Sequence, residues 1–155
     1  MTRKMAVLLA VFGSGAMLSG AFAFQIVGGM HPCTLCLWQR WPHAAAIVIG
    51  LLALVIPGRA LPLLGAAAAA TTVGIALFHT GVERHWWEGI ASCTGNSLAG
   101  LNAADLLNTA IVIAPPVRCD EVPWEMFTLS MASWNGLASV GLVALWLTAA
   151  RARQA

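Results

Sequence analysis

The longest uncharged apolar run of the chain lies near its N-terminus, and it decides which solvent the fold can use. Residues 5–27 form 23 consecutive positions without a charged side chain. A helix of about 20 apolar residues crosses the roughly 30 Å hydrocarbon layer of a bilayer. Apolar residues make up 59% of the chain and charged residues only 9%, too little charged surface for a soluble protein of this size. The sequence therefore predicts one integral-membrane domain over residues 1–155.

Three further apolar runs follow, at residues 41–57, 61–79 and 133–150. We therefore expect an all-α membrane protein, a four-transmembrane-helix bundle with spans at about 5–27, 41–57, 61–79 and 133–150. A cleavable signal peptide is the alternative for the first run, because Ala21-Phe22-Ala23 resembles a cleavage site. The apolar run, however, continues beyond that site.

The placement of charge predicts the orientation of this bundle. All six acidic residues fall between positions 83 and 125, whereas basic residues cluster at both termini and at Arg59. Because cytoplasmic segments are enriched in Lys and Arg, we expect both termini in the cytoplasm of a bacterium, with segments 28–40 and 80–132 on the periplasmic side of its inner membrane. The chain has no Lys/Arg-rich run, so no nucleic-acid partner is indicated.

The long periplasmic segment contains another apolar stretch, at residues 98–114. This stretch carries Asn102, Asp105 and Asn108 near its middle, and an unpaired acid is costly in hydrocarbon. A short helix lying in the membrane interface accommodates these side chains better than a fifth span.

All four cysteines, Cys33, Cys36, Cys93 and Cys119, map to the predicted periplasmic face. Four cysteines allow three pairings, and the sequence alone does not choose among them. Adjacency favours Cys33–Cys36, which leaves Cys93–Cys119 as the second pair. Thiols in an oxidising compartment are expected to pair.

The C-x-x-C motif at Cys33 and Cys36 has the surroundings of a reactive site. Pro32 precedes it and an apolar run follows, which places Cys36 in the first turn of the second helix. A helix N-terminus stabilises a thiolate. Arg40 lies one turn further on the same face, where its guanidinium can donate to an anionic oxygen, such as that of a reduced quinone.

Other interpretations of these residues remain open. The cysteines can form two purely structural disulfides in a non-catalytic membrane protein. They can also hold zinc, although the second pair lacks the short spacing of a zinc ribbon. Arg40 can act as an interfacial anchor. His79, at the end of the third run, can donate to a quinone carbonyl or relay a proton, or simply cap its helix.

Several blocks of the chain resemble the disulfide bond formation protein B (DsbB) family. They are the C-x-x-C followed by Gln39-Arg40, the His79-Thr80-Gly81-Val82-Glu83 block, Cys93-Thr94-Gly95, and the segment from Arg118-Cys119-Asp120 to Trp134-Asn135. The resemblance covers nearly the whole chain.

The resemblance implies a protein-disulfide oxidoreductase that reoxidises a periplasmic thioredoxin-like (DsbA-like) thiol oxidase and passes the electrons to a membrane quinone, ubiquinone or menaquinone. The partner would attack Cys93, the freed Cys119 would attack Cys33, and Cys36 would face the quinone. Arg40 would hold the quinone with His79 nearby, and no metal is implied.

One related enzyme class competes with this interpretation. Vitamin K epoxide reductase-like proteins also couple a C-x-x-C to a quinone. In that family the motif lies late in the chain, whereas here it precedes the second predicted helix.

Overall fold

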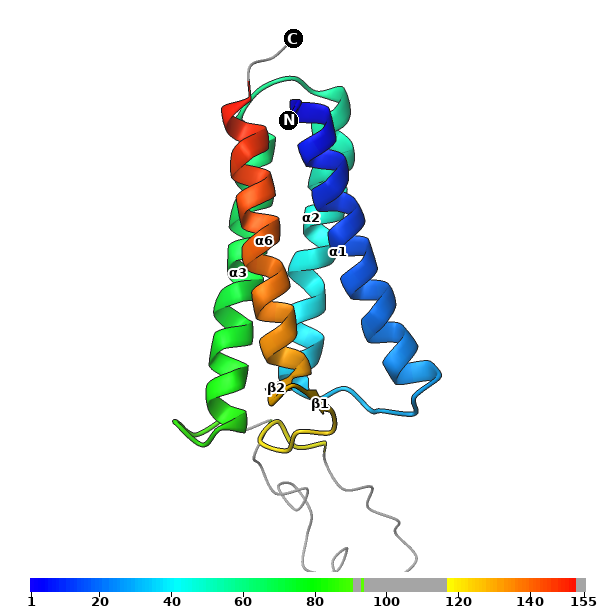
Figure 1. The fold of residues 1–155 in the computed structure, drawn as a ribbon, viewed down its shortest axis with the longest axis vertical. Helices are drawn as coiled ribbons and strands as arrows, with labels where there is room; N and C mark the ends of the chain where they lie inside the picture. Colours follow the sequence, from blue (N-terminus) through cyan, green and yellow to red (C-terminus); the bar gives the residue numbers. More distant parts are fainter. Residues whose placement is uncertain (91–92, 94–116, 153–155) are drawn as a thin grey trace, which may run out of the picture.

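The computed structural model of the protein describes residues 1–90, 93 and 117–152, and these form a helical bundle (Figure 1). Helix α3 packs against α2 and α6, and α1 packs against α2 and α6. Both termini lie at one end of the bundle, and the connection between α1 and α2 lies at the other. The elements are α1 (Arg3–Ile26), α2 (Thr34–Val55), α3 (Ala60–Glu83), β1 (Glu125–Met126), β2 (Leu129–Ser130) and α6 (Met131–Arg151).

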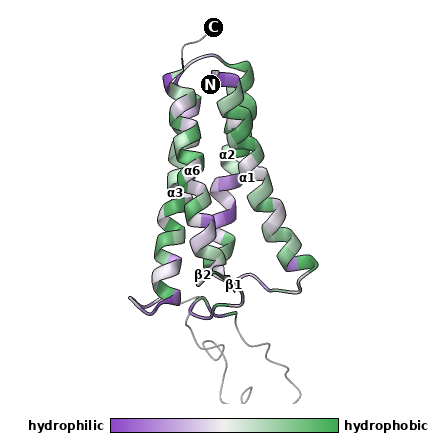
Figure 2. Cartoon of the chain, viewed as in Figure 1, coloured by the Kyte–Doolittle hydropathy of each residue, from purple (hydrophilic) through white to green (hydrophobic). Residues whose placement is uncertain are grey.

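Three of these helices, α1, α3 and α6, are long and apolar enough to cross a membrane, and hydrophobic residues extend along most of their length (Figure 2). Helix α2 does not meet the same measure because Gln39, Arg40 and His43 lie in its first turns. It begins at Thr34, which confirms the prediction that Cys36 lies in its first turn, and it therefore extends beyond the predicted span 41–57 at its N-terminal end. The predicted interfacial helix at 98–114 lies outside the described residues.

The structure contains a short β-hairpin that the all-α prediction did not include. Strands β1 and β2 pair antiparallel, with Glu125 opposite Ser130 and Met126 opposite Leu129. The two residues between them, Phe127 and Thr128, both have positive φ angles, 53° and 64°. A two-residue loop with this backbone matches the right-handed twist of paired strands. The hairpin leads directly into α6.

Side chains cap three of the helices at their N-termini. Thr2 accepts from the backbone N–H of Met5, and Ser130 accepts from that of Ser133. At the start of α2, the sulfur of Cys33 accepts from the backbone N–H of Cys36 at 3.2 Å. A cap satisfies an N–H that has no partner within the helix. The first cysteine of the C-x-x-C thus also defines where α2 begins.

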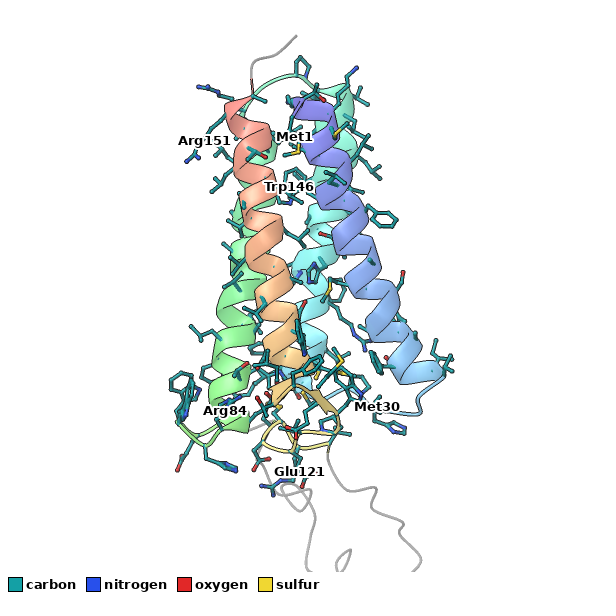
Figure 3. All side chains as sticks on the ribbon, in the orientation of Figure 1. Met1, Met30, Arg84, Glu121, Trp146 and Arg151 are labelled. Carbon is teal, nitrogen blue, oxygen red and sulfur yellow. A yellow bond between two sulfur atoms is a disulfide. The ribbon has the colours of Figure 1, made fainter. Side chains whose placement is uncertain are left out.

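The terminal end of the bundle contains an apolar core around Trp146, which is completely buried and lies between the helices in Figure 3. Here helices approach closely because their contact residues are small. A Cβ atom on Gly65 would lie 2.5 Å from the indole of Trp146. We call the following set the Trp146 core: Ala6, Val7, Ala10, Ala46, Ala53, Ala66, Ala69, Leu142, Trp146 and Ala149.

At the same end of the bundle, the side chain of Arg3 links α1 to the turn between α2 and α3. The guanidinium of Arg3 donates to the backbone oxygen of Ile56 at 3.0 Å and to that of Gly58 at 3.3 Å. Gly58 has a φ of 124°, a conformation that glycine adopts without steric cost. The start of α1 is therefore tied to the α2–α3 turn.

Candidate functional site

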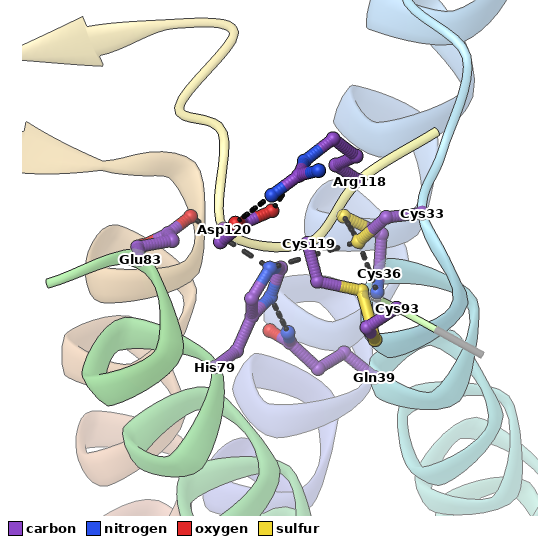
Figure 4. Close-up of a disulfide and its surroundings, with 9 residues drawn as sticks. All are labelled: Cys33, Cys36, Gln39, His79, Glu83, Cys93, Arg118, Cys119 and Asp120. Carbon is purple, nitrogen blue, oxygen red and sulfur yellow. Dashed lines mark hydrogen bonds and ion pairs between the residues drawn. A yellow bond between two sulfur atoms is a disulfide. The ribbon is translucent and has the colours of Figure 1, made fainter. Parts of the chain in front are cut away.

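A second buried cluster occupies the opposite end of the bundle. It contains Cys33, Leu35, Val82, Cys93 and Cys119, each at most 4% exposed. We call it the cysteine cluster. It joins the start of α2 and the end of α3 to the segment before β1 (Figure 4). Residues from three distant parts of the sequence are therefore packed together around sulfur.

Cys93 and Cys119 form a disulfide. This is the second of the two cysteine pairs that the sequence analysis favoured. The backbone N–H of Cys119 also donates to the backbone oxygen of Cys93 at 3.3 Å, and the N–H of Cys93 donates to that of Ile90 at 2.8 Å. The disulfide is therefore also held by its backbone next to the end of α3.

The pair that adjacency favoured, Cys33 and Cys36, is not disulfide-bonded in the structure: both are free thiols, and their sulfurs lie 2.9 Å apart. Cys33 donates its S–H to the sulfur of Cys36. This hydrogen bond, together with burial, raises the pKa of the Cys33 thiol. Negative charge on the pair is therefore held on Cys36, which is less buried than Cys33.

The two cysteine pairs lie next to each other. The sulfur of Cys33, the sulfur of Cys119 and a ring nitrogen of His79 all lie within 4.8 Å of one another. Disulfide exchange needs an attacking sulfur in reach of a disulfide sulfur, and this arrangement supplies it. The same three atoms are candidate metal ligands. While Cys119 is in a disulfide, however, Cys33, Cys36 and His79 provide at most three ligands, fewer than a structural zinc site uses.

His79 joins the cysteines to a buried polar network. Its Nε2 lies 3.6 Å from the sulfur of Cys33 and 3.7 Å from Oε1 of Glu83. Its Nδ1 lies 2.9 Å from Nε2 of Gln39. The Ser130 hydroxyl donates to the other oxygen of Glu83. Both His79 and Gln39 are nearly fully buried.

The network continues into the bundle. Nδ2 of Asn135 on α6 donates to Oε1 of Gln39 at 2.6 Å, and Oδ1 of Asn135 lies 3.0 Å from Nε2 of His43. The sequence-based site did not include Gln39, Asn135, His43 or Glu83. The available signal was their polarity within apolar helices, since polar groups at such positions are usually partnered and functional.

Arg40 lies on the α1 side of the site. Its guanidinium donates to Oε1 of Gln25 at 2.6 Å and to the backbone oxygen of Ala21 at 3.3 Å. It also lies 4.7 Å from the centre of the Phe22 ring. Its Nε is buried and has no hydrogen-bond partner among the described residues. The Arg40 side chain also lines a cavity at this end of the bundle.

A cavity of about 320 Å³ connects these groups. Residues of α1, α2, α3 and α6 and of the segment before β1 line it, among them Cys36, Arg40 and His79. Arg118 and Asp120 form an ion pair beside it. The hydrogen bond from Arg118 holds the pKa of the Asp120 carboxyl below its usual range. A largely apolar cavity with a few fixed polar groups is typical of a small-molecule site.

Comparisons with known proteins give one consistent match. The family model described as "Disulfide bond formation protein DsbB" matches residues 3–149. A protein named "Disulfide bond formation protein B" from Xanthomonas axonopodis pv. citri (strain 306) is 31% identical over 149 residues, which cover 90% of this chain and 84% of that protein. One of the same name from Polaromonas naphthalenivorans (strain CJ2) is 31% identical over 160 residues, 98% of this chain and 94% of that protein. No solved structure shows significant similarity.

Proposed function

Because this chain belongs to the disulfide bond formation protein DsbB family, we propose that it is a quinone-reducing protein-disulfide oxidoreductase of the membrane. It reoxidises a periplasmic DsbA-like thiol oxidase and passes the electrons to a membrane quinone. The observation that supports this proposal most directly is the approach of Cys33 to Cys119 beside a cavity that Cys36 lines. Two exchangeable pairs in reach of each other form a relay.

The cysteines transfer electrons in two exchange steps. A thiolate of the partner attacks Cys93, forming a mixed disulfide and releasing Cys119 as a thiolate. Cys119 then attacks Cys33 of the oxidised C-x-x-C, so that the Cys33–Cys36 bond breaks and Cys36 leaves as a thiolate. Each attack exchanges one S–S bond for another. The two exchanges thus place a thiolate on Cys36, while the partner remains bonded to Cys93 until its own second thiol displaces that sulfur.

The residues around the cavity fit a quinone. Its volume lies at the lower end of the range for small-molecule sites, about 300–1,000 Å³. Arg40, whose guanidinium can donate to an anionic oxygen, lines the cavity together with Cys36 and His79. When bound, a quinone supplies the two-electron acceptor for the dithiol.

The orientation and the fourth span belong to the same proposal. We propose a single integral-membrane domain in a bacterial inner membrane, with α2 as its fourth span, the termini in the cytoplasm and the cysteines in the periplasm. The polar groups of α2 are compatible with a span because Gln39 and His43 are hydrogen-bonded within the bundle. The basic termini share one end of the bundle (Figure 1), in agreement with positive-inside orientation.

The proposal is tested by mixing detergent-purified protein with a reduced thioredoxin-like oxidase and a soluble ubiquinone analogue. The wild type should remove the quinone absorbance. Each of the variants Cys33→Ser, Cys36→Ser, Cys93→Ser and Cys119→Ser should fail to do so, because each lacks one sulfur of the relay. Unchanged turnover in any one of them contradicts the relay.

The role of Arg40 has a separate test in the same assay. Arg40→Ala should raise the KM for quinone about tenfold, the value of one charge-assisted hydrogen bond, with little change in the KM for the partner protein. Arg59→Ala is the matched control, because Arg59 precedes α3 at the other end of the bundle. An unchanged quinone KM in Arg40→Ala rejects this role.

A further inference from the structure

The groups around Cys33 and His79 determine which atom is the donor in each hydrogen bond of the buried network. Nε2 of His79 lies near two acceptors, the carboxylate of Glu83 at 3.7 Å and the sulfur of Cys33 at 3.6 Å, and the His79 ring also hydrogen-bonds the backbone of Cys119. Cys33 directs its own proton to Cys36, so its sulfur presents lone pairs to the imidazole. Because an unprotonated Nε2 would face only acceptors, the proton of neutral His79 lies on Nε2.

The rest of the network follows from that proton. With Nε2 protonated, Nδ1 of His79 is an acceptor, and Gln39 must present its NH₂ group to it at 2.9 Å. Oε1 of Gln39 then faces Asn135, which donates its own NH₂ at 2.6 Å. Oδ1 of Asn135 is left to accept from Nε2 of His43 at 3.0 Å. Each group has one role, and no donor faces a donor.

We propose that His43, Asn135, Gln39 and His79 form a one-way hydrogen-bond chain that ends on the sulfur of Cys33. Each member donates to the next, from His43 in the bundle interior toward the cysteine. Gln39 and Asn135 are positioning residues that act through His79. They fix its tautomer, so that a ring N–H always faces Cys33. The hydrogen-bond chain itself does not depend on the proposed function; only its effect on catalysis rests on that function.

The consequence concerns the sulfur that exchanges bonds with both of its neighbours. Cys33 carries developing negative charge whenever it attacks Cys36 or Cys119, or leaves from a bond with either. A hydrogen bond to an ionised sulfur stabilises it, and aligned hydrogen bonds strengthen one another by polarisation. The His79 N–H therefore stabilises charge on Cys33 without giving up its proton. The members from His43 to His79 are at least partly buried.

The test reads the tautomers directly, without turnover. Nitrogen-15 NMR of histidine-labelled full-length protein in detergent should show Nε2 protonated and Nδ1 unprotonated for both His79 and His43. Gln39→Glu should invert His79, because a carboxylate at this position accepts from Nδ1–H. Gln25→Glu is the matched control. It makes the same chemical change at the same end of the bundle, but Gln25 contacts Arg40, so His79 should keep its tautomer.

A second substitution reaches His79 through an intermediate residue. Asn135→Asp places an acceptor beside Gln39, which must then turn its NH₂ group away from His79 and present its oxygen, again inverting the tautomer. Asn135 and His79 make no direct hydrogen bond in this network. A change of tautomer at His79 in this variant must therefore be transmitted through Gln39. Wild-type His79 with its proton on Nδ1, or an unchanged tautomer in both Gln39→Glu and Asn135→Asp, overturns the proposal.

The catalytic consequence has its own measurement. In the quinone assay, Gln39→Glu and Asn135→Asp should each lower kcat about tenfold, the value of one hydrogen bond to a charged group, with an unchanged KM for the partner. An inverted tautomer with full kcat rejects the catalytic consequence but not the chain. No turnover in the wild type rejects the proposed function and leaves the tautomer result standing.

Discussion

The two ends of the bundle each place a tryptophan against a glycine of α3, but the two tryptophans differ in exposure. At the terminal end, Trp146 packs on Gly65 and is completely buried. At the cysteine end, Trp87 packs on Gly81 and remains 42% exposed. A buried ring has no place to move to, whereas an exposed ring can turn outward. The terminal end is therefore built for rigidity, and the cysteine end tolerates rearrangement near its surface.

The largest effect should follow from removing the buried ring. Trp146→Ala should lower the free energy of unfolding by about 3–5 kcal/mol, because the small residues around it cannot fill the space. Thermal or denaturant unfolding in detergent measures this loss. Trp41→Ala is the matched control, since Trp41 is 75% exposed and its loss opens no cavity. Equal losses in the two variants would contradict the distinction between core and lipid-facing tryptophans.

A smaller loss should follow from crowding the same ring. Gly65→Ala places a Cβ within 2.6 Å of three ring atoms of Trp146, and overpacking of this kind costs about 1–3 kcal/mol. Gly74→Ala on the same helix meets nothing within 4 Å, so it should stabilise by up to about 1 kcal/mol through helix propensity. The free energies of unfolding of the two variants, measured in the same detergent, test this difference. A stabilised Gly65→Ala protein would show that the Trp146 core is loosely packed.

The corresponding change at the cysteine end should cost less. In Gly81→Ala the new Cβ would lie 2.0 Å from the Trp87 ring, so the ring turns outward and gives up its hydrogen bond to the backbone oxygen of Phe78. We expect a loss of about 1 kcal/mol, the value of that bond. In a Trp87→Ala background, Gly81→Ala should cost nothing. If Gly81→Ala still lowers the free energy of unfolding in this background, the new Cβ must clash with a group other than Trp87.

The smallest effect concerns the surface ion pair of Arg118 and Asp120. Because the pKa of Asp120 is lowered in the folded protein, the pair stabilises above the unfolded pKa and loses this effect as the pH falls below about 4. Asp120→Asn should lower Tm slightly at pH 7, and the difference from the wild type should shrink progressively as the pH falls below about 4. A difference that grows on acidification would reverse the sign and refute the ion-pair effect. Glu121→Gln serves as the control, since its contact with Arg118 is longer.

The helices and the closeness of the Cys33 and Cys36 sulfurs could be predicted from the sequence because both depend on local pattern. Membrane-spanning helices need long apolar runs, and a C-x-x-C places two sulfurs within one helical turn. The hydrogen-bond partners of the polar residues in the first turns of α2 could not be predicted, because they lie on other helices. Gln39 bonds to Asn135, 96 positions away, and no local pattern reports such a partner.

The hairpin before α6 was missed for a different reason. Two-residue hairpin loops favour Asn and Gly, which accept positive φ angles easily. Here Phe127 and Thr128 adopt that conformation, so the usual turn signal is absent. The backbone oxygen of Thr128 accepts from Arg84, and that of Met126 accepts from Trp134. Contacts with α3 and α6 therefore stabilise a turn that its own residues do not favour.

The disulfide between Cys93 and Cys119 has a consequence for how this family can diversify. It fixes both ends of the intervening segment, with the two Cα atoms 5.0 Å apart, beside the sulfur of Cys33. Doubling the length of a closed loop costs only about 0.6 kcal/mol of closure entropy. Insertions and deletions between the two cysteines therefore leave Cys119 in register with Cys33. The number of residues between the two cysteines can therefore change while Cys119 keeps its place beside Cys33.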